Sequence, residues 1–223
     1  MAVSTTTNYA MTARDVIDYA LGKLGVLAGG NAPTAEDIAH TLISLNLMLK
    51  SWQLNGPNLW RKTRGSLTLT DGTASYSLPL AHRVISCRFR QNGRDLPMEL
   101  MTGEDYDDMV LKTSTGIPTQ YYFDAQQDAA QSMLYIWPVL ATAAGETIEY
   151  TYQRRFFDVA TLDDTIDVPQ EYLSLVGYAL AYDVAADFQV SPATVEKPLA
   201  RLMTNAMAAD REPAYRFEPD MRR

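Results

Sequence analysis

The chain has 223 residues, 47% of them hydrophobic and 21% charged, which is typical of a soluble globular protein with room for one large or two small domains. Its formal net charge of −8 argues against a protein that binds nucleic acid without regard to sequence, because such proteins need an excess of Lys and Arg to neutralise phosphates. The single cysteine, Cys87, excludes an intramolecular disulfide, and no apolar run is long enough to cross a bilayer.

Residues 1–59 are predicted to form an N-terminal helical hairpin. The first eleven residues are polar and lack the apolar segment of a secretory signal, which favours a protein made in a reducing cytoplasm. Thr12 and Asp15 have the spacing of a capping box in which Asp replaces the usual Glu, and Thr34 and Asp37 repeat it. Two helix starts are therefore expected at these threonines.

The two helices that follow carry apolar residues at three- and four-residue spacing, which places those residues on one face of each helix. These residues are Val16, Ala20, Leu24 and Leu27 in the first helix, and Ile38, Leu42, Leu45, Leu49 and Trp52 in the second. We expect Gly29-Gly30 to end the first helix and Asn55-Gly56-Pro57 to end the second. The short connection favours antiparallel packing of the pair.

Residues 60–160 change to an alternating pattern and are predicted to form an inserted antiparallel β-domain. Residues 66–70 and 74–78 flank Asp71-Gly72, and residues 84–90 and 94–98 flank Asn92-Gly93, so both pairs are predicted hairpins. Further strands are expected at 119–123, 133–137 and 147–152, with Pro138 ending the second of these. The acidic run from Glu104 to Asp108 could form a short surface helix.

Residues 161–211 return to helical spacing and would complete the helical part of the chain. Pro169 fits the first helical position, and the apolar stripe that follows it is Leu173, Val176, Leu180, Val184 and Phe188. A second stripe of small residues, Gly177, Ala181 and Ala185, would let another helix approach closely. A last helix is expected from about Ser191-Pro192, with a kink at Pro198 or a start nearer to it.

The predicted fold class is therefore α+β: an antiparallel bundle of about four helices, an inserted antiparallel β-domain, and an extended C-terminal tail at 212–223. The tail has no period, and its two aromatic residues, Tyr215 and Phe217, stand in an otherwise polar segment. Such a segment buries too little apolar surface to order alone, so we expect it to order against a partner with these two aromatics as anchors.

Residue types that carry chemistry are sparse. His40 and His82 have no neighbours at metal-ligand spacing, and no glycine-rich phosphate loop is present. Asp163, Asp164 and Asp167 suit a loop and helix start, where carboxylates interact favourably with the helix dipole, better than a cation site. We therefore predict no catalytic residue, no cofactor and no metal. The remaining alternative of this class is a metal-dependent hydrolase that uses these three carboxylates.

Basic and aromatic residues are the candidates for contact with other molecules. Five arginines on the predicted strands could touch DNA or a neighbouring subunit, and solvated strand ends are the simpler interpretation: Arg88, Arg90, Arg94, Arg154 and Arg155. A DNA-binding module that uses the first three is a second alternative, and steeply salt-dependent affinity for duplex DNA would reveal it. The many Tyr and Trp residues of the β-domain suit sheet packing or a protein interface.

The order of short motifs is more informative than any one of them. The motifs are Leu24-Gly-Val-Leu27, Pro33-Thr-Ala-Glu-Asp37, Leu45-Asn-Leu-Met-Leu-Lys-Ser-Trp52, Leu67-Thr-Leu, Tyr76-Ser-Leu-Pro79, Arg83-Val-Ile, Gly116-Ile-Pro-Thr119, Leu134-Tyr-Ile-Trp-Pro138 and Asp164-Thr-Ile-Asp-Val-Pro-Gln-Glu-Tyr172. This succession resembles the head-to-tail adaptors of tailed bacteriophages, the connector family that includes packaged-DNA-stabilising and tail-tubular proteins. The resemblance covers roughly residues 11–210.

The resemblance implies a structural virion protein at the head–tail junction, assembled in the host cytoplasm. It implies a dodecameric ring of this chain that docks under the portal protein, continues the channel for passing double-stranded DNA, and receives the tail nozzle or stopper. No membrane is involved. A C-terminal extension would embrace the portal, although the tail carries no motif of its own to align. The candidate portal-binding residues are Pro213, Tyr215, Arg216, Phe217, Arg222 and Arg223.

Overall fold

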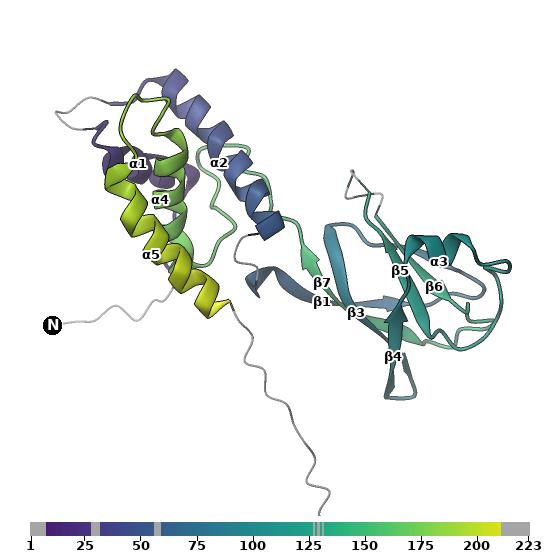
Figure 1. The fold of residues 1–223 in the computed structure, drawn as a ribbon. Coiled ribbons are helices and arrows are strands. Elements are labelled where there is room, and N and C mark those ends of the chain that lie inside the picture. Colours follow the sequence, from purple (N-terminus) through teal and green to yellow (C-terminus); the bar gives the residue numbers. More distant parts are fainter. Residues whose placement is uncertain are drawn as a thin grey trace, which may run out of the picture. The chain divides into compact units, whose positions relative to one another are not determined.

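The computed structural model describes residues 8–27, 32–55, 59–126, 128, 130 and 132–210, and the chain divides into two compact units. Residues 1–59 and 156–223 belong to a helical unit, and residues 60–155 belong to a β unit (Figure 1). The fold is α+β, as the sequence predicts, with five α-helices and a seven-stranded sheet within the described residues. The candidate tail residues from Pro213 to Arg223 lie outside the described part.

The two predicted capping boxes open the first two helices. Helix α1 spans Ala13–Leu24, and Thr12 caps it while the Asp15 carboxylate accepts a hydrogen bond from the Thr12 backbone N–H at 2.9 Å. Helix α2 spans Ala35–Asn55 and starts in the same way from Thr34. Its end agrees with the predicted stop signal.

The end of α1 differs from the prediction. The helix stops at Gly25, whose φ of 77° is the left-handed conformation that glycine adopts without a Cβ clash. Gly25 takes this conformation four residues before Gly29-Gly30, so the helix ends a turn earlier than expected. Gly29 and Gly30 themselves lie outside the described residues.

Helix α4, Leu173–Val184, is the central helix of the helical unit. It follows a short 3₁₀ helix, η3, at Gln170–Tyr172. Pro169 therefore precedes the 3₁₀ turn, and the prediction that it is the first residue of the α-helix was wrong. Proline at 169 has an extended ψ of 151°, which is incompatible with a helical first residue. The predicted stripe from Leu173 to Val184 is buried, and Phe188 lies beyond the helix end.

The helices pack around α4 rather than as a simple hairpin. Helices α1 and α2 touch each other, but each makes its more extensive contact with α4, and so does α5, Ala193–Ala209. The predicted stripe of small residues on α4 lets α1 approach closely at Gly177, because a Cβ there would collide with the ring of Tyr19 on α1. Pro198 lies inside α5 and does not delay its start.

The β unit is one sheet in the order β1-β7-β3-β4-β5-β6-β2. Its elements are the 3₁₀ helix η1 (Leu59–Arg61), β1 (Lys62–Thr68), β2 (Ser75–Ser77), β3 (Ala81–Gln91), β4 (Arg94–Leu100), α3 (Gly103–Asp107), β5 (Gln120–Asp124), β6 (Met133–Trp137) and β7 (Thr147–Arg154). The predicted surface helix in the acidic run is α3. All pairings are antiparallel except β4 with β5, which is parallel, so the expectation of a purely antiparallel sheet was wrong.

One predicted hairpin is confirmed and the other is wrong. Strands β3 and β4 pair across Asn92-Gly93, and both turn residues have positive φ. The turn at Asp71-Gly72 also forms, but β1 pairs with β7 and β2 with β6. The Gly72 N–H donates to the Leu140 carbonyl at 2.8 Å, and the Asp71 carboxylate accepts from the Ala143 N–H at 2.7 Å. The segment around this turn is therefore held against the 140–146 loop and not against its sequence neighbour.

The core of the β unit lies on one face of the sheet. Cys87 and Phe89 on β3 point into it together with residues of β4, β5, β6 and β7, and the set is Leu69, Leu78, Ala81, Val84, Cys87, Phe89, Met98, Tyr121, Leu134, Ile136, Leu140 and Ile148. Burial raises the pKa of the Cys87 thiol to about 12, so this cysteine is an unreactive core residue. Alternate β3 residues, including Arg88 and Arg90, face the other side.

Candidate interaction surfaces

In the acidic loop before α4, Asp164 stabilises the backbone through hydrogen bonds. The Asp164 carboxylate accepts hydrogen bonds from the backbone N–H groups of Ala160 (2.8 Å) and Thr161 (2.7 Å). The hydrogen bonds from Thr161, followed by that from Ala160, lower the pKa of Asp164, as expected for a carboxylate that accepts several donors. No group of three or more His, Cys, Asp or Glu side chains within the described residues could hold a metal ion. The three candidate carboxylates of a hydrolase are therefore not brought together as a cation site.

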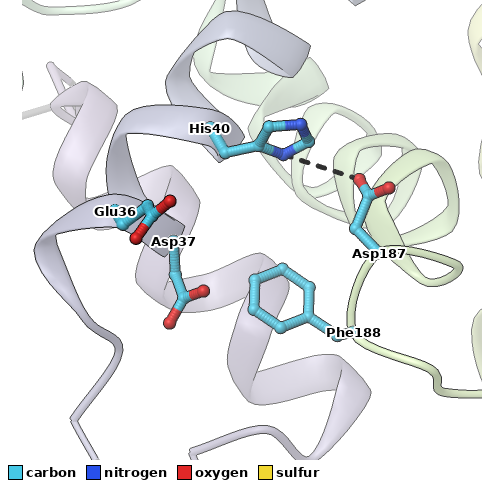
Figure 2. Close-up of a pocket in the computed structure, with 5 residues that line it drawn as sticks. All are labelled: Glu36, Asp37, His40, Asp187 and Phe188. Carbon is cyan, nitrogen blue, oxygen red and sulfur yellow. Dashed lines mark ion pairs between the residues drawn. The ribbon is translucent and has the colours of Figure 1, made fainter.

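A surface pocket lies where the start of α2 meets the segment after α4 (Figure 2). Its lining residues are Glu36, Asp37, His40, Asp187 and Phe188. His40 Nδ1 lies 3.7 Å from Asp187 Oδ2, so the two form an ion pair when the imidazole is protonated. The carboxylate of Asp37 is occupied by the cap of α2, where hydrogen bonds from the Thr34 side chain and backbone lower its pKa. The lining contains no hydroxyl or thiol nucleophile beside the imidazole, so the arrangement suits a link between two elements better than catalysis.

Arg90, on the outward face of the β3–β4 hairpin, is matched by two acidic residues. Arg90 donates two hydrogen bonds to the Asp95 carboxylate, at 2.6 and 2.9 Å, and Arg90 Nη1 lies 3.4 Å from Glu149 Oε1. The hydrogen bond from Arg90 holds the pKa of Asp95 below its ordinary value. Arg88 lies opposite Glu149 in the β3–β7 register, and Arg94 is exposed near the turn. The positive charge of Arg90 is therefore already balanced before any phosphate approaches it.

The second pair of candidate arginines serves the end of β7. Arg155 Nη2 donates to the Gln126 carbonyl at 2.7 Å, and Arg154 Nη1 donates to the carbonyl of Arg155 at 3.3 Å. Burial, followed by the nearby charges of Arg61, Arg155 and Arg83, lowers the pKa of His82. These arginines thus hold backbone in place and create a local positive field inside the β unit.

An unpredicted apolar stripe lies on α2. Ile43, Leu47 and Leu54 are 60%, 65% and 74% exposed, and their spacing of four and seven residues places them on one line of the helix. The opposite face of α2, with Leu45 and Trp52, is buried. The signal was present in the sequence, because the helix carries apolar residues on both faces, and a second stripe on a helix marks a second packing partner. No helix among the described residues is long and apolar enough to span a membrane.

A second group of exposed apolar side chains belongs to the β unit. Val110, Leu111 and Ile117 lie in the segment between α3 and β5, and Leu100 is the last residue of β4. Val110 is fully exposed. Beside this segment, Tyr106 on α3 stacks on Tyr122 of β5 with ring centroids 5.7 Å apart. The aromatic residues predicted for sheet packing or an interface are therefore divided between buried positions, such as Tyr121 and Tyr106, and half-buried ones, such as Tyr122.

Comparison with known protein families identifies a match to this chain. The chain matches the model of the family described as SU10 adaptor protein over residues 11–222. The match covers both compact units and nearly all of the chain. No curated protein matches it.

Proposed function

The chain belongs to the SU10 adaptor protein family, and on this premise we propose that it is the head-to-tail adaptor of a tailed bacteriophage. It is a structural phage adaptor, and proteins of such a family are generally not enzymes. The proposal adds that copies of the chain form a ring, a dodecamer, at the head–tail junction of the virion. The observation that carries it is the extent of the family match, which includes the helical unit and the β unit together.

In the proposed assembly the ring docks beneath the portal protein and extends the channel through which double-stranded DNA passes. The next tail component, a nozzle or stopper, would attach to its other side. The net charge of −8 supports this role, because DNA must slide past such a surface without binding to it. The ion-paired Arg90 of β3 supports it as well, since its charge is already matched by Asp95 and Glu149.

Portal binding is assigned in this proposal to the C-terminal residues, with Tyr215 and Phe217 as anchors. Removal of the residues after Asp210 should abolish association with the portal and leave the fold of both units unchanged. The far-ultraviolet circular dichroism spectrum and the unfolding midpoint serve as controls for the fold. Unchanged portal binding by a folded truncated protein would remove this part of the proposal.

The decisive experiment measures the mass of the purified protein in solution, alone and mixed with the portal ring of the same virus. We expect one copy of this chain to join each portal subunit. A portal ring that is shown to be intact and still binds no copies would overturn the head-to-tail role. The mass of the protein alone then reports separately whether the ring forms without the portal.

A further inference from the structure

The apolar stripe on α2 needs a partner that lies outside the chain's own core. Ile43, Leu47 and Leu54 project from a regular 21-residue helix whose other face is anchored by Leu45 and Trp52. The stripe is therefore held in a fixed line. Exposed apolar residues that are scattered singly need no explanation, but three in line on one helix form a ridge suited to a groove on another helix.

We propose that Ile43 and Leu47 of this ridge pack against α5 of a second copy of the chain, so that α2 and α5 form the contact between neighbouring subunits. The inference rests on the proposed ring and assigns its contact surface. The outer face of α5 carries small residues at Ala200, Thr204 and Ala208, all exposed. A line of small side chains leaves a shallow groove into which larger side chains of another helix fit.

The spacing of the two faces matches. On α2 the outward positions Glu36, Ile43 and Leu47 are separated by seven and four residues, and on α5 Lys197, Thr204 and Ala208 are separated by the same steps. Each series covers about 16 Å at the rise of an α-helix. Parallel helices in this register place the carboxylate opposite the ammonium and the two apolar side chains opposite the small ones.

Charge complementarity favours the same pairing. Glu36 is exposed at the start of α2, and Lys197 and Arg201 are exposed on the first half of α5. Within the part of the chain that the structure describes, none of these three side chains forms an ion pair. The acidic end of one face and the basic end of the other are thus both open to an intermolecular partner.

The arrangement of the helices makes this contact heterologous. Helix α4 packs against both α2 and α5, and Figure 1 shows α2 and α5 on either side of α4 and running in the same direction. Two different faces on opposite sides of a subunit join copies head to tail, and rotation about an axis along these helices keeps neighbouring helices parallel. A closed ring follows when the rotation closes.

The test uses two variants of the full chain, each with one added cysteine: Leu47→Cys and Ala208→Cys. The native Cys87 is buried with a raised pKa, so it contributes little background. The variants are mixed, assembled on the portal ring and oxidised, and the products are separated on a denaturing gel. We expect a covalent dimer from the mixture and none from either variant alone. An Arg14→Cys variant on the exposed side of α1, mixed with Ala208→Cys, should give no dimer.

Charge reversal provides a second test of the proposed contact between α2 and α5. Glu36→Lys and Lys197→Glu should each reduce the dimer yield in the cysteine mixture several-fold, and the two changes in one chain should restore it. Dimers from Leu47→Cys alone would instead indicate that two α2 helices meet. That result, or absence of dimers from complexes whose mass shows a full set of copies on the portal, would overturn the proposed pairing while leaving the head-to-tail role intact. Failure to join the portal at all would count against the role, and the cross-linking pattern of the concentrated protein alone would then decide the pairing.

Discussion

The two units differ in how their outer surfaces are completed. On the sheet of the β unit, Arg90 is paired with Asp95 and with Glu149, so its outward charge is balanced within the unit. In the helical unit, α2 instead turns Leu47 and two further apolar residues outward, and α5 presents Lys197 without an ion-pair partner in the described residues. The sheet face is thus suited to solvent, and the helical faces are suited to cover by more protein.

The contrast also separates a fixed surface from an adaptable one. Three exposed apolar residues of the helical unit, Ile43, Leu47 and Leu54, stand on a single long helix, whereas Val110 and Ile117 of the β unit stand on a connecting segment. A rigid helix favours a permanent contact between identical copies, because little conformational entropy is lost when it packs. A connecting segment suits a contact that must adapt to a different protein.

The largest expected effect on stability comes from a comparison of substitutions on the buried and exposed faces of α2. Trp52 is 8% exposed, and Trp52→Ala should lower the free energy of unfolding by about 3–5 kcal/mol, because it removes buried surface and leaves a cavity. Ile43→Ala, on the exposed face of the same helix, should change it by less than about 0.5 kcal/mol. Denaturant unfolding of the protein without the portal measures both. Similar losses for both variants would mean that the exposed face is already covered in the free protein.

A second pair of variants tests how closely the helices pack. Gly177→Ala on α4 should destabilise the protein, because overpacking against the Tyr19 ring costs about 1–3 kcal/mol and exceeds the gain in helix propensity of about 0.5–1 kcal/mol. Gly22→Ala on α1 should stabilise it by about 0.5–1 kcal/mol, since its new methyl group meets only Leu27 at ordinary contact distance. Unfolding midpoints of the two variants should therefore move in opposite directions. A shift in the same direction would show that Tyr19 moves aside freely.

The features that could be predicted from sequence are those decided within a few residues. The capping boxes at Thr12 and Thr34 and the turn at Asn92-Gly93 depend on local hydrogen bonds and backbone conformation, and all three are confirmed. Strand pairing depends on distant residues. The turn at Asp71-Gly72 formed as its sequence predicts, yet its flanking strands found partners elsewhere because the loop at 140–146 supplies the hydrogen-bonding groups.

The candidate interaction residues show the same limit. Residue type identified Arg88, Arg90 and Arg94 as potential phosphate contacts, but Glu149, one of the two acidic partners of Arg90, comes from a neighbouring strand that only the fold brings close. The α2 stripe was missed because the core-facing period of Leu45, Leu49 and Trp52 already accounted for the helix. The sequence shows that apolar residues occur on both faces of the helix, but it does not show which molecule covers the outer face.

The carboxylates that take part in the helix N-caps make the stability of both units depend on pH. Asp37 on α2 and Asp105 on α3 have lowered pKa values, each because of a hydrogen bond from the preceding threonine side chain and then from its backbone. A carboxyl whose folded pKa is depressed adds stability that is complete above its ordinary pKa of about 3.9 and is lost as pH falls through the folded pKa. Asp37→Asn should therefore destabilise the protein at pH 7 and lose most of this effect near pH 3.

Thr34→Ala provides the matching measurement, with an expected loss of about 0.5–2 kcal/mol for a missing N-cap. Free energies of unfolding for the wild type and both variants, measured from pH 3 to pH 7, test the linkage. If the loss of unfolding free energy caused by Asp37→Asn stays constant over this range, the negative charge of the carboxylate does not contribute to stability.

The smallest expected effect concerns the balanced charges of the sheet. Asp95→Asn combined with Glu149→Gln should free Arg90 to bind phosphate and raise the affinity for duplex DNA. The slope of log affinity against log salt concentration should steepen by about 0.9 for each further phosphate that the protein neutralises. Glu104→Gln combined with Asp108→Asn changes the net charge equally but removes no partner of Arg90, so it should leave the slope nearly unchanged. Equal steepening in both double variants would mean that net charge alone keeps DNA off this face. A change confined to the first would mean that the ion pairs themselves let DNA pass a surface rich in arginine.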